Sequence, residues 1–269
     1  MPTATSALGS GTRGTACSGP EEGEMRRCAL VTGGSRGIGA AVAVKLAARG
    51  YDVALSYRTQ CTAAEEVAAA VQRRGSRALI LQADLADLEQ ARTLVHEAAE
   101  GLGALHILVN NAGYVQRMPW EDLSLEDWER MIRVGLTSAF VCSRCAVPYM
   151  REAGFGRIVN ISSLRALTGS AHGVHYAAAK AGLLGLTKSL ALALAPMGIT
   201  VNAVCPGFVA TAINEEALAT RGDEIRAQIP LGRVASAEEI AAVIAFLCSE
   251  EASYITGETV SVNGGLRMG

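Results

Sequence analysis

The chain has 269 residues, of which half are apolar and 19% are charged. Such a composition excludes a disordered chain and allows one large domain or two small ones with a sizeable core. The 24 basic and 26 acidic side chains give a formal net charge of -2. This balance leaves no positive excess for nucleic acid or for an anionic membrane, so we expect neither as a partner.

The seven cysteines are scattered, and their odd number is unlike a secreted disulfide scaffold. The one close pair, Cys142 and Cys145, has no second pair or histidine cluster at zinc spacing. We therefore expect it to pack within a helix, and we predict no metal site. No apolar run approaches the roughly 20 residues of a membrane-spanning helix, and the N-terminus lacks the order of a secretory signal. These features favour a soluble cytoplasmic protein.

Residues 1–25 are mostly small or polar and show no periodicity, which predicts a flexible tail. From Arg26 onward, short apolar runs alternate with longer amphipathic stretches. The predicted strands are 29–32, 52–57, 78–83, 106–110, 157–162, 200–204 and 258–262, and the predicted helices are 37–49, 62–74, 88–101, 125–151, 176–194 and 237–249. Capping boxes are predicted for Thr62 with Glu65 and for Ser236 with Glu239. The alternation predicts one α/β domain over 26–269, a doubly wound parallel sheet with helices on both faces.

A glycine-rich turn follows the first predicted strand. The sequence from Thr32 to Gly39 reads T-G-G-S-R-G-I-G, and an alanine-rich helix comes next. Glycines let the backbone approach a pyrophosphate closely, and the helix N-terminus offers unpaired N–H groups and a partial positive charge. A glycine-rich turn alone is a weak signal, but its place between the first strand and a helix predicts a dinucleotide site. The expected contacts are Gly33, Ser35, Arg36, Gly37, Ile38 and Gly39.

The end of the second predicted strand indicates which dinucleotide binds. A site for NAD places an acid there, which accepts hydrogen bonds from the ribose 2′-hydroxyl. This chain has Tyr57 and Arg58 instead, and Arg36 in the glycine turn could close on the same group from the other side. Guanidinium groups pair with a 2′-phosphate that a carboxylate would repel, so NADP(H) is predicted. The alternative is that both arginines are solvated surface residues.

Three further residues form a candidate reaction centre. Ser163 follows the fifth predicted strand, and Tyr176 and Lys180 lie four residues apart on one face of the next long helix. An unperturbed tyrosine has a pKa of about 10, which a nearby ammonium group would lower toward the range of an acid–base catalyst. Ser163 could hold a carbonyl oxygen beside the phenol. The alternative is an ordinary amphipathic pair and a strand-end hydroxyl, which becomes less plausible when the other motifs occur in the same order.

With these motifs the sequence from about Arg26 to Gly269 resembles the short-chain dehydrogenase/reductase family, and within it the β-ketoacyl-[acyl-carrier-protein] reductases. The motifs are the glycine turn at 32–39, Asp84, N-N-A-G at 110–113, Ser163 with Tyr176 and Lys180, and P-G-F-V-A-T at 206–211. The resemblance implies a Rossmann domain with a seven-stranded parallel sheet, and a homotetramer with a subunit contact at 262–265. It assigns Ser163 to the substrate carbonyl, Tyr176 to proton delivery, and Lys180 to the nicotinamide ribose and to lowering the tyrosine pKa.

The resemblance also implies further contacts with NADP(H). Asp84 and Leu85 would lie against the adenine, and Asn111 would lie near the adenosine ribose. Val209 and Thr211 would contact the nicotinamide carboxamide. The remaining expected cofactor residues are Ala112, Gly113, Pro206 and Gly207, together with Tyr176 and Lys180. Residues 212–230 resemble the substrate lid of the family, where the identity of the substrate would be encoded.

One position departs from the family pattern. The fourth catalytic residue of the family, an asparagine in the helix after N-N-A-G, corresponds to Gly135 here. In the family, a backbone carbonyl at that bend holds a water that links the lysine to solvent. Glycine presents a carbonyl and tolerates bent backbone, but it lacks the side chain that fixes the bend. Either proton supply is slower with the chemistry intact, which we favour, or the chain binds cofactor without turning over.

The arginines through which such reductases meet an acidic carrier protein are also missing, because their positions hold Gly154 and Met197. Arg117, Arg151 or Arg165 could replace them. A free or coenzyme-A-linked ketone is therefore nearly as plausible as one tethered to acyl carrier protein.

Arg165 and two histidines lie close to the candidate reaction centre in the sequence. His172 and His175 fall between Ser163 and Tyr176 or directly before the tyrosine. All three could line the pocket and contact a polar substrate. The plainer expectation is that both histidines are partly exposed loop residues.

The sequence thus predicts an NADPH-dependent carbonyl reductase that acts on a small-molecule ketone, foremost a 3-oxoacyl thioester. An alternative is a catalytically impaired NADP(H)-binding subunit, which Gly135 alone favours and which the tyrosine–lysine pair argues against. A nucleotide-sugar epimerase or dehydratase would need a separate C-terminal substrate region, for which we expect little room.

Overall fold

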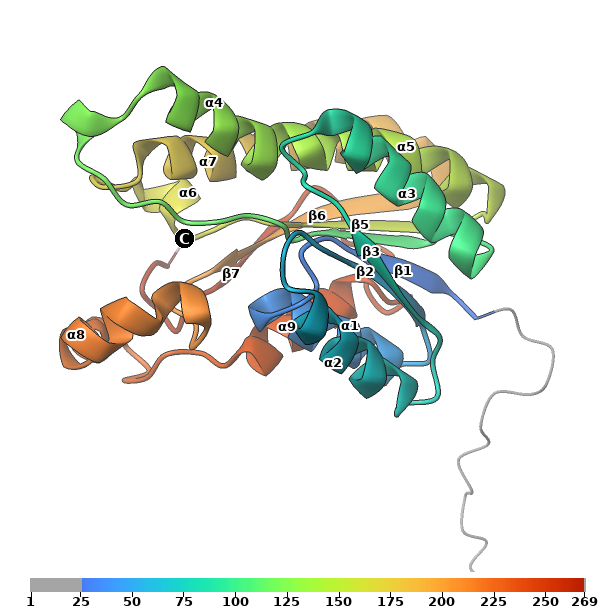
Figure 1. Cartoon of the computed structure of the whole chain (residues 1–269), viewed down its shortest axis with the longest axis horizontal. Helices are drawn as coiled ribbons and strands as arrows, with labels where there is room; N and C mark the ends of the chain where they lie inside the picture. The colour runs from blue at the N-terminus through green and yellow to red at the C-terminus, as the bar shows by residue number, and fades with distance from the viewer. Residues whose placement is uncertain (1–25, 269) are drawn as a thin grey trace, which may run out of the picture.

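Seven parallel strands form one sheet in the order β3-β2-β1-β4-β5-β6-β7 (Figure 1). The computed structural model describes residues 26–268, so the predicted tail over 1–25 lies outside the described residues. The strands are β1 Cys28–Val31, β2 Asp52–Tyr57, β3 Ala78–Gln82, β4 Ile107–Asn110, β5 Gly156–Ile161, β6 Ile199–Pro206 and β7 Thr259–Val262. Each neighbouring pair is parallel, which confirms the predicted sheet.

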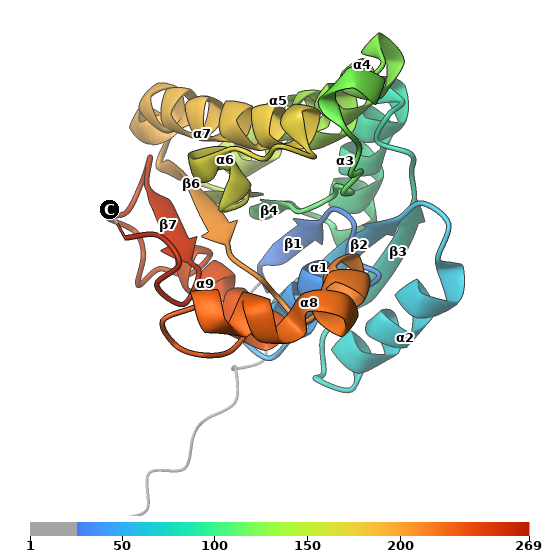
Figure 2. The same ribbon diagram turned by 90° about the vertical axis from the view of Figure 1, so that its left-hand side faces the viewer.

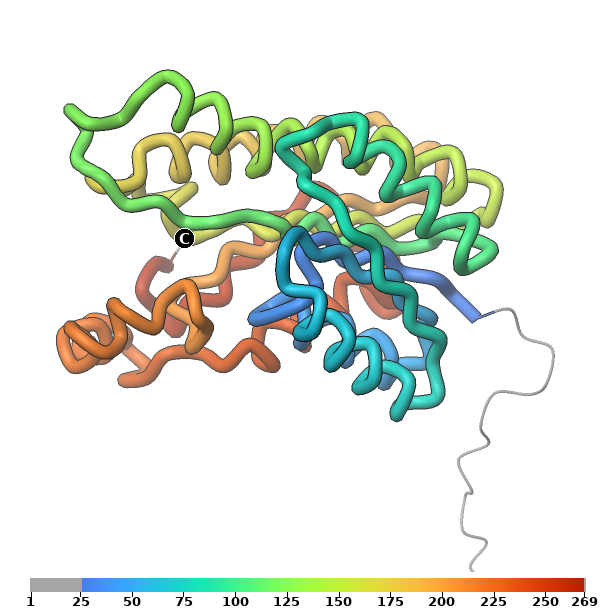
Figure 3. Tube along the Cα trace, viewed as in Figure 1, coloured from blue at the N-terminus to red at the C-terminus, as the bar shows by residue number. Residues whose placement is uncertain are grey.

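Helices cover both faces of the sheet (Figures 1 and 3). Those with α geometry are α1 Gly37–Ala47, α2 Cys61–Gln72, α3 Leu88–Leu102, α4 Leu125–Ile132, α5 Ser138–Glu152, α6 Arg165–Thr168, α7 Val174–Leu194, α8 Glu215–Gln228 and α9 Ala237–Leu247. Because successive side chains of a strand point to opposite faces, Ala29 and Val31 enter the apolar core beneath α1, α2 and α9. Leu30 enters the second core, beneath α3, α5 and α7. The continuous apolar runs of the sequence reflect this burial on both faces.

The order of the strands reverses between β1 and β4. In an open parallel sheet, the strand ends diverge at such a point and leave a crevice beyond their carboxyl ends. The glycine turn follows β1 at this point, and the N-N-A-G segment at 110–113 follows β4 beside it. Figure 2 views the molecule from this side, with α6 and α7 above and α8 below.

The predicted helix over 125–151 consists of three parts. Between α4 and α5 the chain forms a π-helix, Arg133–Thr137, with the buried Gly135 at its centre. The wider turn bends the helix at the position where the sequence departs from the family pattern, and π-turns are frequent at functional sites.

Of the two predicted capping boxes, the structure contains one. Helix α2 begins at Cys61 after Gln60 and has no side-chain cap, so the predicted box at Thr62 is wrong. The box of Ser236 and Glu239 at α9 is confirmed, because each side chain accepts from the other residue's backbone N–H. Residues 212–230 contain a short 3₁₀ turn and α8, a helix that the sequence did not predict.

Helix α7 corrects the expectation about membrane spans. The segment Val174–Met197 is long and apolar enough to span a membrane by length and composition, with a mean hydropathy of 1.3. Alanines and leucines keep this average high although Lys180 and Lys188 interrupt the apolar run. Because α7 packs on β6 and α4, it is a helix of the folded domain.

The cysteines of residues 26–268 are free, and none forms a disulfide within that part of the chain. Cys142 is buried in α5 and Cys145 is half-buried, in line with the packing role expected for this pair.

Candidate active site

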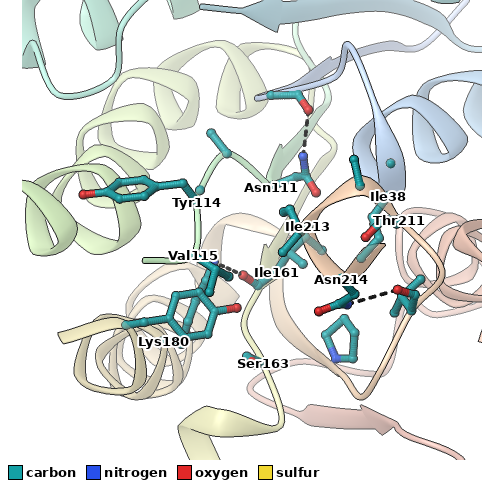
Figure 4. Close-up of a pocket in the computed structure, with 18 of the residues that line it drawn as sticks. Ile38, Asn111, Tyr114, Val115, Ile161, Ser163, Lys180, Thr211, Ile213 and Asn214 are labelled. Atoms are coloured by element: carbon teal, nitrogen blue, oxygen red, sulfur yellow. Dashed lines mark hydrogen bonds between the residues drawn. The ribbon is translucent and has the colours of Figure 1, made fainter. Parts of the chain in front are cut away.

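A cleft of about 610 Å³ opens at the carboxyl ends of β1, β4, β5 and β6 (Figure 4). Helices α6 and α7 lie on one side of these strand ends and α8 on the other (Figure 2). Almost all predicted site residues line this cleft. They are Gly33, Ser35, Arg36, Gly37, Ile38, Arg58, Asp84, Leu85, Asn111, Ala112, Gly113, Ser163, Tyr176, Lys180, Pro206, Gly207, Val209 and Thr211. Gly39 is the exception and does not line it.

The glycines of the turn are required by close contacts. A Cβ on Gly39 would lie 2.4 Å from the carbonyl oxygen of Gly33, so Gly39 lets the first turn of α1 pack against the loop. Gly33 has a φ of +63°, and a Cβ there would lie 3.0 Å from the Cα of Ala112. Only glycine adopts that backbone conformation without strain. Gly39 therefore supports the turn by packing against it outside the cleft, whereas Gly33 lines the cleft.

Hydrogen bonds join the glycine turn to the ends of β2 and β4. The Thr32 hydroxyl oxygen accepts from the backbone N–H groups of Asn111 and Ala112, both at 3.0 Å. The Asn111 side chain donates to the carbonyls of Thr32 and Gly33 at 2.9 and 3.0 Å. The Gly33 N–H donates to the Ser56 hydroxyl at 3.0 Å. The Asn111 amide is thus committed to the turn, and Thr32 and Ser56 are supporting residues that we did not predict, although a small hydroxyl residue at a strand end is the visible signal.

The nucleotide end of the cleft carries unpaired positive charge. Arg36 and Arg58 line it and are exposed. Among the described lining residues, the one carboxylate is that of Asp84, which accepts from the Ala86 N–H at 2.9 Å and pairs with Arg130 of α4 at 3.7 Å. No acid stands at the end of β2, and the glycine turn is closely packed. The two arginines and the turn therefore fit a dinucleotide that carries a 2′-phosphate.

Lys180 is buried, with 4% of its surface exposed. Its Nζ donates to the Ile161 carbonyl at 2.6 Å (Figure 4). The Ser162 hydroxyl donates to the Lys180 carbonyl at 2.7 Å. These bonds attach α7 to the end of β5. Burial lowers the pKa of Lys180 to about 8, because the charged form loses its hydration.

Tyr176 lies beside Ser163 in the same cleft. Burial raises the pKa of Tyr176, while a hydrogen bond with the Ser163 hydroxyl and the charges of Arg117 and Arg165 act in the opposite direction. The sequence predicted that Lys180 would lower this pKa. Its ammonium donates to a backbone carbonyl and lies 6.0 Å from the centre of the Tyr176 ring, and its effect on the tyrosine pKa stays a prediction.

Known proteins share this architecture over nearly the whole chain. A family model described as "Enoyl-(Acyl carrier protein) reductase" matches residues 33–267. The 3-oxoacyl-[acyl-carrier-protein] reductase FabG of Staphylococcus aureus is 39% identical over 245 residues, which cover 91% of this chain and 100% of the relative. The chain belongs to the short-chain dehydrogenase/reductase family.

Two other proteins are similar over most of the chain. The acetoacetyl-CoA reductase of Shinella zoogloeoides is 42% identical, over 90% of this chain and 98% of the relative. A blue fluorescent protein from a metagenomic library, solved in complex with NADPH, superposes with a TM-score of 0.86 at 39% identity, over 90% of this chain and 98% of that one.

In this member of the short-chain dehydrogenase/reductase family, the place of the missing asparagine side chain is narrow. A Cβ on Gly135 would lie 3.1 Å from the Cβ of Ala179, which directly precedes Lys180 on α7. A side chain at this position would therefore require Ala179 or the π-helix to shift by a few tenths of an ångström.

The two histidines differ in position. His172 is exposed and lines the cleft, so it occupies the position that would allow contact with a polar substrate. His175 is fully buried in α7, and neither ring nitrogen has a hydrogen-bond partner. The expectation of a partly exposed loop residue is wrong for His175, because α7 begins at Val174 and not at Tyr176. Burial lowers the pKa of His175, so the ring is neutral near neutral pH.

A buried polar chain behind the site was not predicted. Asn110 donates to the Asn160 side-chain oxygen at 2.8 Å, and Asn160 donates to the Thr187 hydroxyl at 2.9 Å. Thr187 donates to the Leu183 carbonyl at 2.7 Å. The chain links β4, β5 and α7, and its signal in the sequence is the asparagine within two otherwise apolar strands.

Proposed function

We propose that the protein is an NADPH-dependent carbonyl reductase that converts the ketone of a 3-oxoacyl thioester, or of a related β-keto compound, to an alcohol. The observation that carries the proposal is the meeting of Ser163, Tyr176 and Lys180 with the glycine turn in one cleft. The names of the relatives, a 3-oxoacyl-[acyl-carrier-protein] reductase and an acetoacetyl-CoA reductase, support this substrate class.

The cofactor site consists of the glycine turn, with Arg36 and Arg58 at the 2′-phosphate. When bound, NADPH supplies the hydride for the carbonyl carbon and remains as NADP⁺. Tyr176 gives its proton to the carbonyl oxygen, which the Ser163 hydroxyl holds by a hydrogen bond. A raised tyrosine pKa keeps that proton in place at neutral pH, which suits a proton donor for reduction. The Lys180 ammonium holds the nicotinamide ribose.

We further propose that 212–230 acts as the substrate lid, that the thioester is linked to coenzyme A or acyl carrier protein, and that the chain is a cytoplasmic homotetramer. The lid proposal is supported by Ile213, Asn214 and Arg221, which line the cleft. Figure 4 shows Ile213 and Asn214 among the side chains of the pocket.

The absorbance of NADPH tests the assignment. We expect consumption with short 3-oxoacyl thioesters, and a fall in kcat of about 100-fold or more in Tyr176→Phe, because the proton donor is lost. The fully exposed Tyr254 offers a matched control, and Tyr254→Phe should keep the rate. Undiminished consumption in Tyr176→Phe would show that the phenol is not the donor.

A further inference from the structure

Three arginines line the substrate side of the cleft and have no role in the proposed chemistry. Arg117 lies in the loop after β4, Arg165 begins α6 two residues after Ser163, and Arg221 lies in α8. They come from segments far apart in the sequence, and the fold brings all of them to one opening. Arg221 occupies the kink of α8, where the backbone departs from helical geometry.

None of these three guanidinium groups forms an ion pair or a side-chain hydrogen bond with another residue of 26–268. Arginines elsewhere in that range do find carboxylates: Arg77 meets Asp52 at 2.7 Å and Arg233 meets Glu239 at 2.6 Å. Exposed arginines outside the cleft, such as Arg74 and Arg144, also have no carboxylate partner within 26–268, so what distinguishes these three is that they share one opening.

The acidic residues near the cleft do not cancel this charge. Asp84, the one carboxylate among the described lining residues, lies at the nucleotide end and pairs with Arg130. Asp127 is engaged by Gln116 and by Ser124. Clefts lined by one sign of charge concentrate ligands of the opposite sign. The charges on the substrate side of this cleft are positive, although the chain has a net charge of -2.

We propose that the substrate carries an anionic oxygen group, a carboxylate or a phosphate, which Arg117 and Arg165 bind beside the reacting ketone while Arg221 closes on it from α8. This inference rests on the proposed function, whose substrate class it narrows. Planar guanidinium groups bind carboxylate and phosphate oxygens in bidentate fashion, so the arrangement suits such a group.

The position of the charges relative to Tyr176 supports the proposal. Arg117 and Arg165 are near enough to lower the pKa of the phenol. An anion bound between them would offset that effect, and the phenol would then hold its proton more firmly in the substrate complex. The anionic group would thus aid both binding and proton delivery.

Matched pairs of ketones test the proposal and separate two sources of the anion. Acetoacetate against its methyl ester tests a carboxylate on the acyl part, and acetoacetyl-CoA against the neutral N-acetylcysteamine thioester tests the phosphates of a carrier arm. We expect kcat/KM with NADPH to favour the anionic partner of one pair about tenfold or more, the scale of one charge-assisted hydrogen bond.

Variants assign that preference to the arginines. Arg117→Gln and Arg165→Gln should raise KM for the anionic ketone about tenfold or more, with little change for its neutral partner. Arg165→Lys should restore part of the loss, because it keeps the charge but not the planar fork. Arg74→Gln, at an exposed site outside the cleft, is the control. No preference in either pair, or a preference that survives both glutamine variants, would overturn the proposal.

A binding measurement separates this inference from the proposed function. Calorimetry of acetoacetate and acetoacetyl-CoA with the NADP⁺-saturated protein requires no turnover. Binding that weakens in the glutamine variants supports the anion site even if no ketone is reduced, in which case the proposed function alone fails. Equal binding by wild type and variants overturns the anion site while the reductase assignment stands on its own rates.

Discussion

Single side chains determine which ligands the cleft accepts. At its nucleotide end, Arg36 and Arg58 are exposed, and no acid follows β2. We expect Arg58→Asp to weaken NADPH binding about tenfold or more and to improve NADH relative to NADPH, because a carboxylate repels the 2′-phosphate and accepts from a 2′-hydroxyl. Fluorescence titration with both cofactors measures the ratio, with Arg74→Asp as the control. A ratio that does not change would mean that Arg58 is a solvated surface residue.

The charge of Lys180 predicts a pH dependence. Its pKa is lowered to about 8, so the side chain is an ammonium below that pH and neutral above it, whereas Tyr176, with a raised pKa, stays protonated. We therefore expect ketone reduction to fall as pH rises through about 8. The pH profile of kcat/KM measures this fall, and Lys180→Met should be slower and lack that limb. A wild-type profile without the limb would contradict the prediction.

At the scale of elements, the π-helix between α4 and α5 packs against Ala179, the residue before Lys180 on α7. We expect the wild-type protein to turn over, and Gly135→Asn to raise kcat by restoring the side chain that fixes the bend. The 3.1 Å approach to Ala179 should cost about 1 kcal/mol or more of stability, since overpacking strains a core. Steady-state rates and denaturant unfolding measure both effects. Gly185→Asn, at an exposed glycine of α7 with open space around it, is the control. Absence of turnover in both wild type and Gly135→Asn would favour the impaired binding subunit.

The elements that could be predicted from the sequence are those whose pattern is local. Buried parallel strands appear as short apolar runs, and their carboxyl ends share one edge, so the glycine turn, N-N-A-G and Ser163 could be placed together before any coordinates. The pairing of Tyr176 with Lys180 required only helical spacing.

The features that could not be predicted depend on tertiary contacts. The apolar period continues through Arg133–Thr137, so nothing local marks the π-turn. Helix α8 is mostly polar, and its few buried positions, among them Ala217 and Ile225, form no clear stripe. The burial of His175 follows from a helix start two residues earlier than expected, and helix ends are the least certain feature of a sequence.

At the scale of the whole molecule, the described chain leaves large apolar side chains exposed. Leu192 is 82% exposed, Met268 is 79% exposed, and Leu231 and Tyr254 are also exposed. Exposed apolar surface favours association, and together with the family resemblance it predicts a homotetramer. Sedimentation equilibrium should give four times the 27.9 kDa mass of the chain. A monomer at micromolar concentration would contradict this prediction.

Helix α8 has an apolar cluster of its own, in which the buried residues are Ala217, Ile225 and Ile229. None of them belongs to the two larger clusters that hold the sheet. A segment with so few buried contacts opens at a small fraction of the free energy that separates the native protein from its unfolded state. We therefore expect α8 to open while the two larger clusters stay packed. If 212–230 is the lid proposed above, the product would leave through this opening without disturbing the residues proposed to hold the nucleotide.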